Sequence, residues 1–187
     1  MIDKKLDERF SSFEAQFEGL SKQLESIQND NLSDRVTLLV FSGDMDKLMS
    51  AFIIGAGAVA MGMEVSMYFT FWGLTALKKQ SLYEGKSIPE KMMAMMLPEG
   101  PDKVGTSKMN MLGFGPAFFK MMMGKNNVET LPDLININKE LGVKMIACQM
   151  TMGVMGITKE ELIDDLEYGG AGTYIGEASD SKITLFI

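Results

Sequence analysis

The residue best suited to covalent chemistry in this sequence is Cys148. It is the only cysteine among 187 residues, and the sequence contains no histidine. Its thiolate is a strong nucleophile, whereas serine and cysteine hydrolases need a histidine base that is absent here. Cys148 ends an apolar run at residues 143–148 and precedes a stretch rich in glycine and methionine at 149–156. The pattern predicts a thiol at the carboxyl end of a strand, followed by a loop.

A lone cysteine at a strand end is also a common small core residue. Two features favour a reactive thiol. Backbone amides of the loop at 149–156 can converge on the sulfur, and the expected topology brings Lys47 and Lys108 to the same edge of the sheet. Amide donors and ammonium groups both lower the pKa of a thiol. From the residue types alone, the reactive and the structural interpretations of Cys148 both stay open.

Apolar strands alternate with helices along most of the sequence. This order predicts an α/β fold with a parallel sheet of about five strands and helices on both faces. Ligands of such sheets bind beyond the carboxyl ends of the strands, where the loops at 42–47, 70–73 and 148–157 lie. We expect strands at 36–41, 64–70, 143–148, 173–175 and 183–187, and helices at 48–61, 71–77, 87–98, 114–123, 130–141 and 158–168.

The first 31 residues form a separate part. Polar, turn-rich residues at 29–34 separate it from an α/β domain at 32–187. The heptad spacing predicts an amphipathic helix over residues 3–29 with one narrow apolar stripe, which packs on its own domain or pairs with another subunit as a coiled coil. The stripe consists of Leu6, Phe10, Phe13, Phe17, Leu20, Leu24 and Ile27.

Composition excludes several classes of protein. The net charge of −7 and the lack of a basic block disfavour nucleic-acid binding. A single cysteine cannot form an internal disulfide, and the charged amino terminus lacks the apolar core of a signal peptide, so we expect a cytoplasmic protein. Between Leu48 and Leu77 only Glu64 is charged, but the 16 residues before it are too few to span a bilayer. A helix, a glycine at 62 and a strand explain this region better.

No cofactor or metal is expected. The glycines at 55–62 lie inside a helix, too far from the preceding strand for a dinucleotide fingerprint, and no P-loop is present. Nineteen methionines are unusual, and they favour a plastic core or an adhesive surface. A copper(I) site is disfavoured because neither histidine nor a second cysteine accompanies them.

Several stretches together resemble the DsrE/DsrF-like family, in the branch often labelled "peroxiredoxin family protein". They are FSGDMDK at 41–47, FTFWGL at 69–74, SKMNM at 107–111, ACQMTMGVMG at 147–156 and LFI at 185–187. The resemblance covers about residues 35–187. It implies a flavodoxin-like α/β fold that assembles into oligomers. It also implies intracellular sulfur trafficking, with the strand-end cysteine, here Cys148, carrying sulfur as a persulfide.

The thiol peroxidase activity suggested by that label is not expected. Thiol peroxidases use a Pro-Thr-Cys loop, whereas Met145, Ile146 and Ala147 precede Cys148 here, and no resolving cysteine exists in the chain. A mechanism that needs two thiols in one subunit is therefore excluded, and any sulfur must be transferred between proteins.

We therefore expect a homo-oligomeric sulfur carrier or sulfurtransferase whose Cys148 takes sulfur from a donor protein and delivers it to an acceptor protein. The alternative is a non-catalytic assembly or membrane-recruitment module, in which the heptad helix and the methionines bind partners or a membrane surface and Cys148 is structural. Besides Cys148, the residues expected to bind substrate are Gly43, Lys47, Trp72, Lys108, Met150 and Gly153.

Overall fold

The computed structural model describes residues 13–14, 16–22 and 33–187, and the chain divides into two compact units, 1–33 and 34–187. In the first unit, residues 13–14 and 16–22 are helical, which confirms the expected helix for that part. Taken by itself, this helix exposes Phe13, Phe17 and Leu20, three members of the heptad stripe. The rest of the helix expected at 3–29 lies outside the described residues, and its pairing with another subunit stays a prediction.

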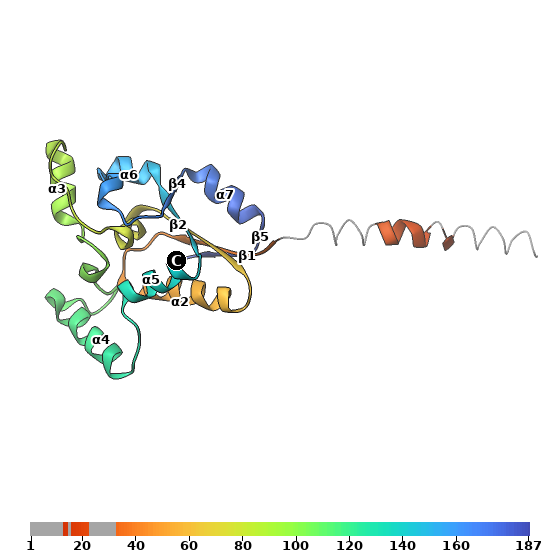
Figure 1. Cartoon of the computed structure of the whole chain (residues 1–187), viewed down its shortest axis with the longest axis horizontal. Helices are drawn as coiled ribbons and strands as arrows, with labels where there is room; N and C mark the ends of the chain where they lie inside the picture. The colour runs from red at the N-terminus through yellow and green to blue at the C-terminus, as the bar shows by residue number, and fades with distance from the viewer. Residues whose placement is uncertain (1–12, 15, 23–32) are drawn as a thin grey trace, which may run out of the picture. The chain divides into compact units, whose positions relative to one another are not determined.

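The second unit is built on a five-stranded sheet in the order β4-β3-β2-β1-β5 (Figure 1). Neighbouring strands from β1 to β4 pair in parallel. At the other edge, Ile187 bonds to the backbone of both Leu39 and Phe41, which is the parallel pattern. The strands are β1 (Ser33–Val40), β2 (Glu64–Phe69), β3 (Lys144–Cys148), β4 (Glu167–Gly169) and β5 (Ser181–Phe186). The fold is thus the expected flavodoxin-like α/β architecture.

Helices cover both faces of this sheet (Figure 1). Helices α2 and α5 lie on one face, and α7 lies on the other. Helices α3 and α4 belong to the long connection between β2 and β3. The helices are α2 (Met45–Ala60), α3 (Ile88–Met96), α4 (Phe114–Lys125), α5 (Leu131–Glu140), α6 (Gln149–Met155) and α7 (Ala171–Ser179), with 3₁₀ turns at Phe71–Leu77, Pro101–Lys103, Met111–Gly113 and Lys159–Glu161.

Alternation along the strands divides the buried side chains between the two faces. Val65, Met67 and Phe69 of β2 enter the large core shared with α2 and α5. The residues between them, Ser66 and Tyr68, point to the opposite face. There Tyr68, Ile146 and Cys148 form a small second cluster, against which Leu39 and Tyr174 of α7 pack. Cys148 therefore lies on the face that α7 covers.

The sparsely charged region between residues 48 and 77 does not form a transmembrane segment. It forms the helix-glycine-strand unit that the sequence favours. Residues 45–60 form α2, Gly62 adopts a positive φ of 80°, and β2 begins at Glu64. A left-handed glycine directly after a helix ends it at low cost. Among the described residues, no helix is both long and apolar enough to cross a membrane.

Three expectations near the carboxyl end were wrong. The predicted loop after Cys148 is helix α6. The helix expected at 158–168 stops after one 3₁₀ turn, and β4 follows at Glu167–Gly169. The capping box of that turn is present, but the carboxylate of Glu161 is buried, where it binds Lys86 at 2.6 Å and the Leu82 amide at 2.9 Å. These bonds hold the turn against the segment that contains Leu82 and Lys86. After the turn the chain continues in an extended conformation into β4.

The strand expected at 173–175 is instead part of α7. Its aromatic and β-branched residues suggested a strand. In the folded protein Tyr174 lies against Tyr68, with ring centroids 5.6 Å apart, and Glu177 forms ion pairs with Arg35 and Lys144. Because these partners lie on the sheet, tertiary contacts override the local propensity. The remaining strands and helices were predicted correctly to within a few residues of their ends.

Candidate thiol site

Cys148 occupies the junction between a strand and a helix. It is the last residue of β3 and the N-cap residue of α6. In the sheet register it lies beside Gly169 of β4, while Ala147 lies beside Phe69 of β2. The cysteine is only 3% exposed. The local sequence explains this placement. The apolar residues Met145 to Cys148 are all buried in the sheet, and the chain then turns into the short helix α6.

Hydroxyl groups surround the thiol. They belong to Tyr68, Thr70 and Thr151, which we call the hydroxyl cluster. The Thr70 and Thr151 hydroxyl oxygens are 2.9 Å apart, and the Phe71 amide donates to Thr151 Oγ1 at 3.2 Å. These contacts fix the start of α6 against the end of β2. They hold the donors in place before any substrate binds.

The hydroxyl cluster changes the acidity of the thiol. Burial raises the pKa of Cys148, but hydrogen bonds from the Thr151 hydroxyl, the Tyr68 hydroxyl, the Thr151 amide and the Thr70 hydroxyl outweigh it. The net result is a pKa below the ordinary value of 9.0. Hydrogen bonds to the charged form of a group favour that form, so this site favours the thiolate.

Tyr68 is the complementary group. Burial, together with its hydrogen bond to Cys148, raises the pKa of its phenol well above the ordinary value. It therefore remains a protonated donor beside the thiolate. The Gly169 carbonyl oxygen is a second acceptor for it, at 3.4 Å, which is a long contact. The single phenolic proton can thus turn from the carbonyl to the sulfur as negative charge develops there.

Three of the residues expected to bind substrate lie together. Gly43, Lys47 and Trp72 line a cavity of about 420 Å³ just beyond the carboxyl end of β1. The sheet order reverses at β1, because the chain proceeds outward to β4 and then returns to the other side with β5. Cavities at such a reversal are common ligand sites. The Lys47 ammonium is engaged there by Asp44 Oδ2 at 2.7 Å.

Two glycines allow this corner to form. A Cβ on Gly43 would lie 2.7 Å from the Trp72 carbonyl oxygen, and one on Gly73 would lie 2.2 Å from that of Val40. Both distances are too short for a side chain, so the turn after β2 can approach the end of β1 only with glycine at these positions. The FSGDMDK and FTFWGL motifs therefore include a packing requirement of the corner.

The other expected residues lie elsewhere. Lys108 lines a separate, largely apolar cavity beside α4. Met150 and Gly153 belong to α6, directly after the cysteine, and Met150 is exposed. Hydroxyls and one amide, rather than Lys47 or Lys108, are the strongest of the groups that lower the Cys148 pKa.

Sequence reasoning did not find the hydroxyl cluster. Tyr68 and Thr70 alternate with the apolar residues of β2, which places them on the face opposite Phe69, and Thr151 lies three residues after Cys148. Both signals exist in the sequence. Their convergence on one sulfur depends on the parallel register of β2 and β3, which the sequence alone does not specify.

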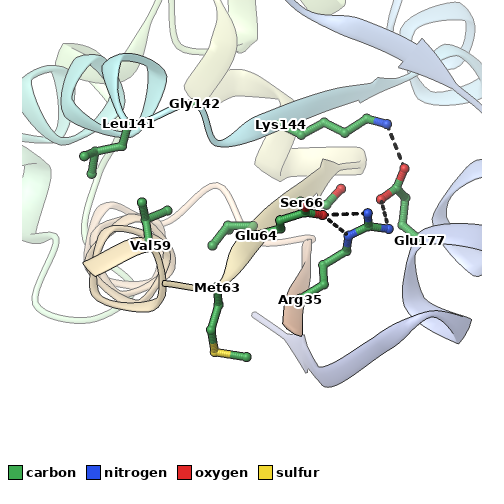
Figure 2. Close-up of a pocket in the computed structure, with 10 residues that line it drawn as sticks. Arg35, Val59, Met63, Glu64, Ser66, Leu141, Gly142, Lys144 and Glu177 are labelled. Atoms are coloured by element: carbon green, nitrogen blue, oxygen red, sulfur yellow. Dashed lines mark hydrogen bonds and ion pairs between the residues drawn. The ribbon is translucent and has the colours of Figure 1, made fainter. Parts of the chain in front are cut away.

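A second group of charged residues lies at the opposite ends of the strands (Figure 2). Glu177 of α7 accepts from Arg35 at 3.2 Å and from Lys144 at 2.7 Å, and Arg35 also binds Glu64. The hydrogen bond that Arg35 donates to the Glu64 carboxylate is the main cause that raises the pKa of Arg35. Since Lys144 begins β3 and Cys148 ends it, this group anchors α7 at a distance from the thiol.

The fold and the site together define a class: a parallel α/β domain with a sheltered, acidified thiol at the end of an interior strand. Within that class the chain belongs to the DsrE/DsrF/DrsH-like family, whose model matches residues 33–186. The family resemblance seen in the sequence is thereby confirmed.

Two curated proteins are similar over most of their own length. The uncharacterized protein YrkE of Bacillus subtilis is 47% identical over 154 residues, covering 82% of this chain and 96% of YrkE. The sulfur carrier protein DsrE2 of Allochromatium vinosum is 35% identical over 157 residues, covering 82% of this chain and 98% of DsrE2. The family thus includes a protein named as a sulfur carrier.

A more distant likeness is the crystal structure of the YchN protein from E. coli. Its TM-score is 0.49 and its identity 11%, over 82% of this chain and 98% of that one. This similarity is too weak to support an inference.

Proposed function

We propose that this protein is a cytoplasmic sulfur carrier that holds sulfane sulfur as a persulfide on Cys148 and passes it to a thiol of a partner protein. The observation that carries the proposal is the thiol itself, placed at the carboxyl end of β3 with its pKa lowered by the hydroxyl cluster. Membership of a family that contains a named sulfur carrier supports the same function.

The chemistry proceeds in two balanced steps. The Cys148 thiolate attacks the outer sulfur of a donor persulfide, so that a new S–S bond forms on Cys148 while the donor's S–S bond breaks. The donor sulfur leaves as a thiolate and takes a proton from solvent. In the second step an acceptor thiolate attacks the outer sulfur on Cys148, and the Cys148 thiolate is released. Neither step changes the overall oxidation level of the pair.

The hydroxyl cluster suits both steps. In the first, its donors stabilise the attacking thiolate, and in the second they stabilise the same thiolate as the leaving group. This removes the need for a histidine base, which the chain lacks. Burial of Cys148 limits side reactions of the persulfide, while the cargo sulfur extends about 2 Å beyond Sγ, one S–S bond length.

We assign the remaining residues to partner recognition. The cavity at Gly43, Lys47 and Trp72 would receive the partner segment that carries the donor or acceptor thiol. Met150 and Gly153 of α6 would flank the cysteine, and Lys108 would contribute positive charge. Self-association through the heptad stripe of the first unit completes this proposal, since an apolar stripe of that spacing favours pairing of helices.

The test is transfer of sulfur, followed by intact-protein mass spectrometry. The full chain is incubated with glutathione persulfide as donor, desalted and analysed before and after addition of an excess of a small acceptor thiol. We expect a mass increase of one sulfur atom that the acceptor thiol removes, and no increase in the Cys148→Ser variant. No adduct on the wild type, or an adduct that persists in the variant, would sink the proposal.

The low exposure of Cys148 favours one alternative, a non-catalytic assembly module in which this residue is structural. Alkylation of the folded protein with iodoacetamide separates the two. Modification at neutral pH at a rate near that of a free thiol supports the carrier. A thiol that reacts only after denaturation supports the module.

A further inference from the structure

Helix α4 presents its apolar side chains outward. Phe114, Phe118, Met121 and Met122 have the spacing i, i+4, i+7, i+8, which places them on one face of the helix. All four are exposed, with Phe114 77% and Phe118 57% accessible, and we call them the α4 stripe. The buried residue of this helix is Met123, nine positions after Phe114 and so on the opposite side. A helix that packs only on its own domain shows the reverse arrangement.

Neighbouring residues enlarge this surface. Met109 and Met111, just before the helix, are about 70% exposed (71% and 70%). Met109 also lines, with Phe118 and Phe119, an apolar cavity of about 310 Å³ beside α4. Figure 1 shows α4 at the periphery of the α/β domain, away from the sheet. An apolar surface of this kind on a soluble domain marks an interaction site.

The segment that carries the stripe has charge of one sign. Residues 103–128 contain Lys103, Lys108, Lys120 and Lys125 and no acidic residue, although the whole chain carries a net charge of −7. Asp46 of α2 also lines the cavity beside α4, where its carboxylate accepts from the amide and hydroxyl of Ser107. Lys125 lies seven residues after Phe118 and eleven after Phe114, so it shares the face of the stripe. A long lysine side chain beside apolar residues can reach outward to an anionic group while its stem covers apolar surface.

These features select the occupant. A two-fold contact with a second copy would bring the same lysines face to face with no carboxylate from this segment to pair with them. An anionic bilayer instead accepts the Phe and Met side chains at the acyl boundary and offers phosphates to the lysines. Flexible methionines and aromatic rings suit such a surface, which requires no shape complementarity.

We propose that the segment Met109–Lys125 docks on the surface of an anionic membrane, with α4 lying in the interface. The helix has 12 residues, so it lies on the bilayer rather than crossing it. The proposal does not depend on the chemistry of Cys148, and the two can fail separately.

The test is flotation of the full chain with vesicles of phosphatidylcholine alone or mixed with phosphatidylglycerol. We expect binding to the mixed vesicles only, weakened at least severalfold by ~0.5 M NaCl, at which the Debye length is about 4 Å. The double variant Phe114→Ser/Phe118→Ser should lose this binding. The matched control is Ile175→Ser, which removes an exposed apolar residue, 61% accessible, from α7 and should bind like wild type.

A charge variant tests whether the lysines contribute to binding of the anionic membrane. Lys108→Gln/Lys125→Gln should bind mixed vesicles several times more weakly, whereas Lys91→Gln on α3 should bind like wild type. The proposal is overturned if the wild type ignores vesicles of both kinds, or if it binds neutral and anionic vesicles equally. It is also overturned if Phe114→Ser/Phe118→Ser binds vesicles like wild type, or if it converts a self-associating wild type into a monomer, which would assign the stripe to a second copy.

Discussion

The surroundings of Cys148 and the outer face of α4 depart from ordinary packing in opposite directions. Around Cys148, three hydroxyl side chains are withdrawn from water, where Thr70 and Thr151 bond to each other and all three lower the pKa of the thiol. On α4, phenylalanines and methionines remain in water. Buried polar groups and exposed apolar patches are the informative departures in a folded protein. This difference underlies the two proposals, chemistry for the first region and contact for the second.

Two matched phenylalanine variants test whether the α4 stripe contributes to the stability of the fold. Phe69→Ala, in the core and stacked on Phe52 at 5.8 Å, should lower the free energy of unfolding by about 3–5 kcal/mol. Phe118→Ala should change it by no more than about 0.5 kcal/mol, because that ring contributes little to the folded core. Urea denaturation of both variants measures the difference. A similar loss for both would show that the α4 stripe is part of the core.

The variant Thr151→Val tests whether the hydroxyl cluster lowers the pKa of Cys148. Loss of this donor should raise the pKa of Cys148 and slow alkylation at neutral pH by about tenfold, since a hydrogen bond to a charged group contributes about 1.5–3 kcal/mol. The measurement is the rate of reaction with iodoacetamide from pH 6 to pH 10. Thr37→Val, which removes another buried hydroxyl, bonded to Ser181 at 2.8 Å, should leave the profile unchanged. An unshifted profile in Thr151→Val would remove the cluster from the mechanism.

The same depressed pKa predicts a pH dependence of stability. The thiolate is favoured in the folded state, so its contribution is fully present above the unfolded-state pKa, near 9.0, and is lost as pH falls through the lower folded-state pKa. The free energy of unfolding of wild type should therefore increase relative to Cys148→Ala as pH rises from 6 toward 9. Urea titrations at several pH values measure this difference, and a slope of opposite sign would contradict the thiolate assignment.

The smallest expected effect concerns access to the thiol. Glu177→Gln weakens the ion pairs that hold α7 to Arg35 and Lys144, and Tyr174 of α7 packs on the cluster that contains Cys148. We expect the alkylation rate to rise by at most about fivefold, the equivalent of about 1 kcal/mol. Asp164→Asn, which breaks an exposed ion pair with Lys79, is the control and should react like wild type. A rate equal to wild type in Glu177→Gln would show that α7 does not limit access.

Much of the framework could be predicted because it depends on local patterns. The runs at 36–41, 64–70 and 143–148 are apolar and bounded by turn residues, so their identity as strands does not depend on distant contacts. The capping residues Thr130 and Ser87 likewise mark real helix starts. The errors fall where distant contacts dominate. Tyr174 and Glu161 each follow a tertiary partner instead of the preference of their own segment.

The sequence by itself determined the candidate nucleophile, the class of fold and the family. A single cysteine without a histidine leaves one candidate thiol, and strand-helix alternation leaves few topologies. Only the tertiary structure decided what surrounds that thiol and which side of α4 faces water. The physical reason is the same in both cases. The register of β2 against β3 brings Tyr68, Thr70 and Thr151 to one sulfur, and packing through Met123 turns the α4 stripe outward. Neither relation is encoded within a single stretch of residues.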